Sequence, residues 1–331
     1  IVSDPYYEIY KFQDHSNRGA PSVIDPTGQT KSGTKWDYAT QWSFHPKELI
    51  SFIYPYHYGL QNHKDLNRGS YWGFMPFTQS THYLGLIVLI FALIGPLILR
   101  PQRKEKLLWI IILLIIATGL GSIVPILYKP FYEYLPLFSK FRVPSMIYLL
   151  LAIIVPILSA RGLDIFLENF ENKISFKRIL QLVGALGIIS FILFIFGEYF
   201  IDFSSDGDVR YSAVQISQLR KYRISLFEKG LINALGLIIV LFVLIFTIKN
   251  NKITPKRFQY GIIIISLLDL GLISNEFIQP KPKKNFDRVF SADKRTTYIL
   301  KDESYFRIFP ADNIGTNRYS YWNIESIGGY R

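Results

Sequence analysis

Six apolar stretches constrain the fold of this chain more than any other feature of its sequence. They are residues 83–99, 107–127, 143–160, 179–200, 228–248 and 258–275. Each is close to the roughly 20 residues with which a helix crosses the hydrocarbon core of a bilayer. The composition agrees, because 50% of the residues are hydrophobic and only 19% are charged, whereas soluble domains average about 25% charged residues. The sequence therefore predicts a mainly α fold, a polytopic membrane helix bundle of about six spans.

The basic residues of the connecting loops predict how these spans are oriented. Loops 100–106, 161–178 and 249–257 hold twelve Lys and Arg in 34 residues, whereas loops 128–142 and 201–227 hold seven in 42. Because Lys and Arg concentrate in cytoplasmic loops, the denser set is predicted to be cytoplasmic. Both ends of the chain are then extracytoplasmic. The net charge of +12 has the same origin, and nucleic acid is not an expected partner.

Three regions follow from this topology. Residues 1–82 are an extracytoplasmic loop segment rich in Tyr, Trp, His, Gly and Pro, and residues 83–275 form the six-span bundle. Residues 276–331 open with a Pro- and Lys-rich linker and then alternate like a strand at 305–309, which predicts the start of a small C-terminal soluble α/β or β domain. Since the chain opens on Ile1 and ends within a glycine-rich motif, we expect it to be an internal piece of a longer protein.

Soluble-enzyme motifs are missing from the sequence. There is no Cys, which excludes disulfides and thiol catalysis, and there is no phosphate loop, dinucleotide fingerprint, zinc-protease motif or nucleophile elbow. All five histidines fall within residues 1–82, and their spacing matches no metal-ligand pattern, so no metal site is predicted: His15, His45, His57, His63 and His82. His45 and Glu48 stand three residues apart and are candidates for acid–base partners; the alternative is an aromatic-walled loop at the membrane interface.

Two charged residues at the edge of or within the apolar stretches are candidates for function. Arg142 lies at the outer edge of the third stretch, directly before residue 143 and after the aromatic and proline-rich loop 129–136. Its guanidinium suits bidentate binding of a lipid phosphate, although an arginine there can also snorkel to the headgroups without a function. Asp269 lies inside the sixth stretch, where an ionised carboxylate is costly. We therefore expect Asp269 to face protein or an aqueous cavity rather than lipid.

An ordered set of soft motifs resembles the bacterial YfhO-type membrane proteins. The motifs occupy residues 42–49, 54–55, 71–77, 83–86, 135–144, 160–164 and 305–330. The resemblance implies a glycosyltransferase of the GT-C type in the bacterial cytoplasmic membrane. Such enzymes move a sugar from a polyprenyl-phosphate carrier to a cell-envelope polymer or lipid acceptor outside the membrane. The resemblance also places the main catalytic carboxylate in a first outer loop, which would precede Ile1.

The resemblance and the residue types together assign candidate roles. His45 or Glu48 would assist proton transfer, Arg142 or Arg68 would hold a phosphate, and Tyr71, Trp72 and Tyr132 would stack on a sugar or on the first isoprene units. Membrane lipids, the carrier-linked sugar and the envelope acceptor are the expected partners. The alternatives are a non-enzymatic membrane scaffold or transport partner in envelope polymer assembly, and a secondary transporter, which the scarcity of buried charge disfavours. The cofactor, donor sugar and acceptor stay open.

Overall fold

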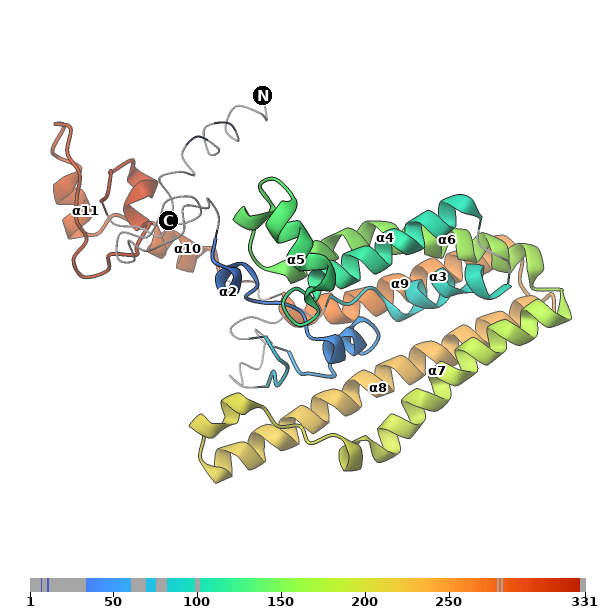
Figure 1. The fold of residues 1–331 in the computed structure, drawn as a ribbon. Helices are drawn as coiled ribbons and strands as arrows, with labels where there is room; N and C mark the ends of the chain where they lie inside the picture. The colour runs from blue at the N-terminus through green and yellow to red at the C-terminus, as the bar shows by residue number, and fades with distance from the viewer. Residues whose placement is uncertain are drawn as a thin grey trace. The chain divides into compact units, whose positions relative to one another are not determined.

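A computed structural model describes Tyr7, Lys11 and residues 34–60, 70–75, 82–98, 102–278, 280 and 282–327. The chain divides into two compact units, Ile1–Phe277 and Ile278–Arg331. Both units are built from helices, and no strand longer than a single bridge occurs in the described ranges (Figure 1).

The first unit contains most of the helices. In chain order, with η for a 3-10 helix, they are α2 (Trp36–Ala39), η2 (Pro46–Phe52), α3 (Leu86–Ile98), α4 (Arg103–Gly119), α5 (Pro125–Tyr134), η3 (Phe138–Lys140), η4 (Pro144–Leu150), α6 (Leu151–Asn169), α7 (Lys173–Phe200), η5 (Asp206–Arg210), α8 (Ala213–Lys249) and α9 (Pro255–Phe277). The second unit contains α10 (Lys283–Val289), α11 (Lys294–Ile299) and η6 (Arg318–Trp322).

Four helical segments are long and apolar enough to cross a membrane: Pro144–Asn169, Lys173–Phe200, Ala213–Lys249 and Pro255–Phe277. This finding supports a helical protein embedded in a membrane. The first two predicted stretches form shorter helices, α3 with 13 residues and α4 with 17. Length and composition therefore assign four spans among the described residues rather than the six expected.

The second predicted stretch, 107–127, is interrupted rather than continuous. Helix α4 ends at Gly119, Gly121 has a positive φ of 51°, and Pro125 begins α5. A Cβ on Gly121 would lie 2.1 Å from Ser43 Oγ. Because proline fits the first turn of a helix but not its interior, and because Ser43 fills the space beside Gly121, the chain turns here instead of continuing as one helix.

Polar side chains mark the start of the two longest helices. Asn172 Oδ1 accepts from the amides of Ile174 at 2.9 Å and Ser175 at 3.2 Å at the start of α7. At the start of α8, Gln215 Oε1 accepts from the amide of Ser212 at 2.9 Å in a capping box. Such caps satisfy amides that the helix itself leaves without partners. Helices α7 and α8 then run for 28 and 37 residues as a long antiparallel pair (Figure 1).

A glycine sets the close contact between α3 and α6. A Cβ on Gly162 would lie 1.8 Å from the carbonyl oxygen of Phe91, so only glycine allows this approach. Phe91 and Phe166 meet edge to face beside the crossing, with ring centroids 6.0 Å apart. Gly162 belongs to motif 160–164, and its role in that motif is helix packing.

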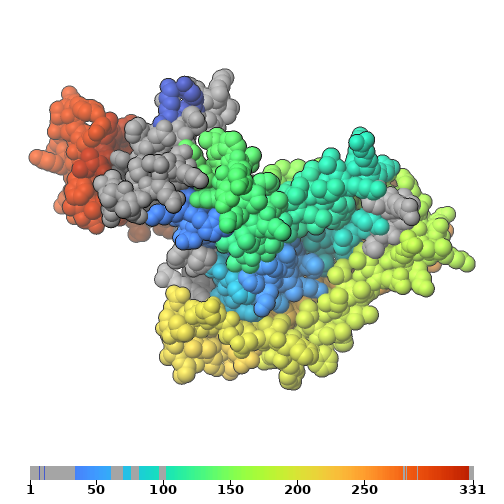
Figure 2. Space-filling model, in the orientation of Figure 1, coloured from blue at the N-terminus to red at the C-terminus, as the bar shows by residue number. Residues whose placement is uncertain are grey.

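Residues 34–60 and 70–75, here called the plug segment, pack into one end of the helix bundle. Phe44, Tyr56 and Leu60 are at most 1% exposed, and Tyr54 shares a 2.9 Å hydrogen bond with Ser190 of α7. Figure 2 shows the blue surface of this segment between the green and teal helices and the yellow-green α7–α8 pair. The segment is thus a packed part of the first unit.

The second unit contains one short β contact in its described residues. Ile308 and Ser326 form an isolated parallel bridge, in which the Ile308 amide donates to Glu325 O at 2.9 Å and the Ile327 amide donates to Ile308 O at 3.0 Å. The pairing involves part of the segment predicted to be extended, residues 305–309.

Candidate functional site

A buried carboxylate occupies the centre of the plug segment. Glu48 lies in η2, which starts after His45 with Pro46 in its first turn. Its side chain is 2% exposed. Oε1 accepts from the Tyr71 hydroxyl at 2.8 Å and from the Phe74 amide at 2.6 Å. Glu48 therefore joins the two parts of the plug segment.

The environment of Glu48 favours proton binding. Burial raises the pKa of Glu48 above its ordinary value, and the hydrogen bonds from Phe74 and Tyr71 offset only part of that increase. Tyr71 is itself held in place, because its hydroxyl accepts from the Met75 amide at 2.9 Å. No described residue donates to Oε2 of Glu48. One oxygen is thus held by two donors, while the other accepts from no group of the described residues.

His45 is close to Glu48 in sequence, and the Glu48 amide donates to the His45 carbonyl at 2.8 Å, but the described structure has no hydrogen bond between the two side chains. Its Nδ1 accepts from the Lys47 amide at 3.2 Å, and its ring stacks on Phe74 with centroids 3.8 Å apart. Burial and then the charge of Lys47 lower the pKa of His45. The imidazole is therefore neutral near pH 7, and only Nε2 has no partner among the described residues.

Arg142 lies in an aromatic cage formed by α2 and the chain that follows it. Its Nη1 donates to the Tyr38 hydroxyl, and its guanidinium carbon lies 4.6 Å from the centroid of the Tyr38 ring and 4.8 Å from that of Trp42. No carboxylate of the described residues lies within 4.0 Å of the guanidinium. A cation held by aromatic rings without a counter-charge is suited to bind an anion.

Backbone strain accompanies this cage. Trp42 has φ 59° and Val143 has φ 65°. For a β-branched residue such as Val143 this left-handed conformation is a genuine outlier, and such residues cost about 1–3 kcal/mol each and cluster at functional sites. The two strained residues flank Arg142, since the Trp42 ring contacts its guanidinium and Val143 follows it in the chain.

The predicted aromatic residues occupy packed positions. The Tyr132 hydroxyl donates to the Thr34 carbonyl, and its ring meets Trp36 edge to face at 5.2 Å. The Trp72 ring packs between Tyr58 at 4.6 Å and Phe203 at 5.4 Å. These contacts, like the Tyr71 bond to Glu48, position the site. The remaining candidate, Arg68, lies outside the described residues.

A buried ion pair near the plug segment was not singled out by sequence reasoning. Arg223 of α8 is 1% exposed and donates to Asp208 Oδ2 at 2.6 Å, to Asp208 Oδ1 at 2.8 Å and to the Phe203 carbonyl at 2.8 Å. Burial acts to raise the pKa of Asp208, but the bonds from Arg223 and Ser205 and the positive charge hold it below its ordinary value. The pair fixes Phe203, which packs against Trp72.

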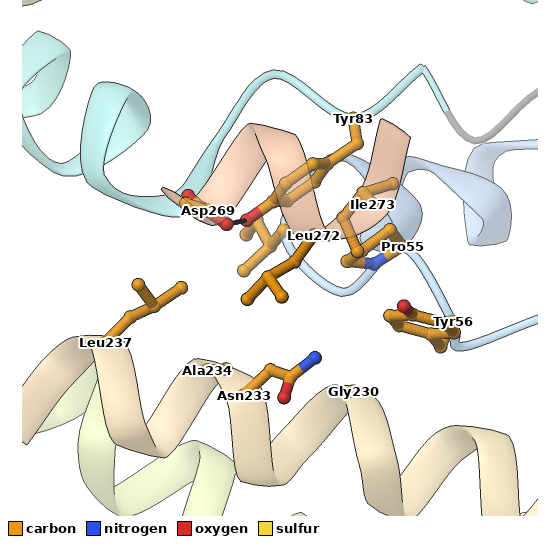
Figure 3. Close-up of a pocket in the computed structure, with 11 residues that line it drawn as sticks. Pro55, Tyr56, Tyr83, Gly230, Asn233, Ala234, Leu237, Asp269, Leu272 and Ile273 are labelled. Carbon is orange, nitrogen blue, oxygen red and sulfur yellow. Dashed lines mark hydrogen bonds between the residues drawn. The ribbon is translucent and has the colours of Figure 1, made fainter. Parts of the chain in front are cut away.

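Asp269 lies inside the protein, as predicted. It is 3% exposed. It accepts from the Tyr83 hydroxyl at 2.5 Å (Figure 3) and from the Leu86 amide at 2.8 Å. A carboxylate of α9 therefore caps the first turn of α3. This explains how a charged residue is tolerated in an apolar helix.

A scan against protein-family models found no match to the chain, and neither did searches of curated proteins and of solved structures. Within the described ranges, no group of three or more His, Asp or Glu side chains could hold a metal ion. The function is therefore inferred from the geometry of two places in the first unit, the Glu48 carboxylate and the Arg142 cage.

Proposed function

We propose that this protein is a membrane glycosyltransferase that moves a sugar from a polyprenyl-phosphate carrier to a cell-envelope acceptor. The reaction takes place at the membrane surface next to the plug segment. In this proposal that surface is the outer face of a bacterial cytoplasmic membrane, the bundle has six spans, and residues 278–331 begin an extracytoplasmic domain. The observation that carries the proposal is the oriented, buried Glu48 carboxylate with one oxygen free.

The chemistry of transfer needs a base and a cation. The acceptor hydroxyl oxygen attacks the anomeric carbon of the sugar, its proton passes to Oε2 of Glu48, and the bond from the anomeric carbon to the carrier phosphate breaks. The bonding electrons leave with the phosphate oxygen, whose negative charge Arg142 stabilises. A raised carboxylate pKa suits the base, because proton transfer is most efficient when the pKa lies nearer the working pH.

The packing of the plug segment connects the surroundings of Glu48 with those of Arg142. Trp42, which covers Arg142, and Tyr71, which binds Glu48, pack against one buried cluster that includes Phe44. His45 supports the same region through its stacking on Phe74. A rigid aromatic cluster of this kind holds reactive groups in place, which transfer chemistry requires.

Replacing Glu48 with Gln tests the base. Glu48→Gln keeps the size of the side chain and an oxygen for the Tyr71 and Phe74 donors, but it cannot take a proton. In the full chain reconstituted with labelled carrier-linked sugar, we expect transfer to fall by about 10²-fold or more, with a normal yield of folded protein. The matched control is Glu133→Gln, because among the described residues Glu133 pairs only with Lys129, at 3.9 Å, and is 42% exposed. Unchanged transfer by Glu48→Gln would refute the role.

Replacing Arg142 with Lys separates phosphate binding from snorkelling. Lysine keeps the charge but loses the planar fork that grips a phosphate, so Arg142→Lys should lose at least about tenfold in transfer and Arg142→Ala should lose more. A snorkelling arginine would tolerate lysine. If both the Glu48 and the Arg142 variants transfer normally, the non-enzymatic scaffold becomes the better interpretation.

A further inference from the structure

Helix α10 of the second unit carries positive charge that no carboxylate in the described part of the chain neutralises. Lys283, Lys284 and Arg288 are all exposed, and none of them forms a salt bridge with a described residue. The other described arginines of the unit each pair with a carboxylate at 2.7 to 3.2 Å: Arg295, Arg307 and Arg318. Against its single carboxylate, Asp287, helix α10 keeps a net charge of +2. Such a surface attracts anions.

A row of aromatic rings begins on the same helix. Phe286 meets Phe290 with ring centroids 4.5 Å apart, and Phe290 meets Tyr321 of η6 at 4.7 Å. Phe286 and Tyr321 are 60% and 57% exposed. The contact with Tyr321 supports α10, because a helix of seven residues is too short to be stable by itself in water. The second unit thus presents exposed aromatic rings and exposed basic side chains from one short helix.

The two kinds of side chain occupy different faces of α10. Phe286 and Phe290 are four residues apart and share one face, whereas Lys284 and Arg288 are four residues apart on another. Lys283 lies one turn before Phe286 and borders the aromatic face. Helices that lie in the plane of a membrane surface have this arrangement, with aromatic residues on the buried face and Lys or Arg on the polar one. The pattern therefore fits a helix at a lipid surface.

The chain itself keeps α10 close to a membrane. Helix α9 is long and apolar enough to cross a membrane, and it ends at Phe277, six peptide links before Lys283 begins α10. Six links reach at most about 22 Å, so α10 starts within this distance of the end of α9 however the two units are placed. A tether of this length makes surface binding intramolecular, and a small patch is then sufficient.

We propose that α10 and the aromatic row anchor the second unit to the headgroup layer of anionic lipids. The Lys283, Lys284 and Arg288 side chains contact lipid phosphates, and the Phe286 and Tyr321 rings enter the boundary between headgroups and acyl chains. A soluble polyanion would engage the charges but would leave the rings in water, which is why a lipid surface fits better. The anchor does not depend on the proposed function or on which face of the membrane the unit occupies.

Fluorescence quenching by lipid headgroups tests the anchor. The chain has no native Cys, so Asn285→Cys, at an exposed position of α10, carries the only bimane label. The full chain is placed in nanodiscs of phosphatidylcholine, with or without phosphatidylglycerol, that contain a lipid with a nitroxide on its headgroup. Quenching should be strong with phosphatidylglycerol, and weaker without it or in about 1 M salt, where charges are screened beyond about 3 Å. Asn313→Cys, exposed and outside α10, is the control position and should be quenched less.

Two double variants of the labelled chain separate the role of α10 from that of net charge. Lys283→Gln with Lys284→Gln should lower the ratio of surface-bound to free α10 by about 25-fold, at about fivefold for each residue. Lys294→Gln with Lys301→Gln removes the same charge from exposed positions outside α10 and should leave the quenching unchanged.

Equal quenching with and without phosphatidylglycerol, or an equal loss of quenching in the two double variants, would overturn the proposal. If quenching is absent from both kinds of nanodisc and soluble polyphosphate alone changes the bimane emission, α10 binds a soluble polyanion instead of a lipid surface.

Discussion

The Tyr83 hydroxyl donates to Asp269 Oδ1 at 2.5 Å, and the Leu86 amide donates to Oδ2 of the same carboxylate at 2.8 Å. Asp269 lies eight residues before Phe277, the last residue of α9, which corresponds to about 12 Å along the helix axis. Helix α3 therefore begins inside the bundle rather than level with the end of α9. Irregular backbone at such a depth is tolerated where protein surrounds it and its amides find partners.

Removing the Asp269 carboxylate should destabilise the start of α3. Asp269→Leu leaves the Tyr83 hydroxyl without its acceptor, at about 1–3 kcal/mol for a buried group, and leaves the Leu86 amide with only its 2.9 Å hydrogen bond to the Tyr83 oxygen. Asp269→Asn keeps one acceptor oxygen, so its loss of stability should be smaller. Thermal unfolding in detergent measures both effects, with Asp164→Asn as the control because Asp164 is exposed on α6. An Asp269→Leu protein as stable as the wild type would contradict the capping role.

Adding a methyl group to Gly162 should disrupt the contact between α3 and α6. The new Cβ would lie 1.8 Å from the Phe91 carbonyl oxygen, and relieving such a clash costs typically 1–3 kcal/mol or more, on the order of other overpacking substitutions. Gly236→Ala is the matched control, because nothing lies within 4 Å of a Cβ at Gly236 in α8, and it should be neutral or slightly stabilising. Equal melting temperatures for the two alanine variants would show that α3 and α6 do not cross at Gly162.

Acid should destabilise the protein through His57. Burial lowers the pKa of His57 to about 4 from 6.5, and its Nδ1 has no partner among the described residues. Between pH 6.5 and pH 4 the unfolded chain binds a proton that the folded chain does not, so stability is lost as the pH falls through this window. The shift corresponds to at most about 3 kcal/mol.

The variant His57→Phe tests this effect, because it removes the titrating ring but keeps an aromatic side chain beside Tyr58 and Phe227. Its melting temperature should fall less between pH 7 and pH 4 than that of the wild type. Some acid sensitivity should persist, because burial also lowers the pKa of His82 to about 4. If the melting temperatures of wild type and variant depended on pH in the same way, His57 would be excluded as a source of the acid sensitivity.

Single cysteines test the orientation of the bundle, and the absence of native Cys makes each of them a clean reporter. Glu171 follows α6 and Ser217 lies in the first turns of α8, and both are exposed. The loop charges predict that Ser217→Cys reacts with an impermeant thiol reagent in intact cells, whereas Glu171→Cys reacts only after permeabilisation. The reverse pattern would invert the predicted topology, and with it the surface on which transfer is proposed.

The candidate site could be predicted only in part from the sequence. Glu48 and Arg142 stood out by residue type and position, but their partners did not. Glu48 is held by Tyr71, 23 residues away, and Arg142 by Tyr38, 104 residues away. No periodicity or motif spacing in the sequence predicts a contact between residues so far apart, because the folding of the plug segment against the helices brings them together.

By itself the sequence determined that this is a helical protein of the membrane and that Asp269 had to face protein or an aqueous cavity rather than lipid. Both conclusions follow from the free energies of transfer from water to the membrane. These depend only on the residues within one stretch and sum over that stretch. Only the tertiary structure decided where the second stretch breaks, because Gly121 turns against Ser43, and which donors satisfy Asp269, because Leu86 lies 183 residues away in the chain. Hydropathy is a local property, whereas the partner of a buried polar group is set by whichever distant backbone or side chain the fold brings within hydrogen-bonding distance.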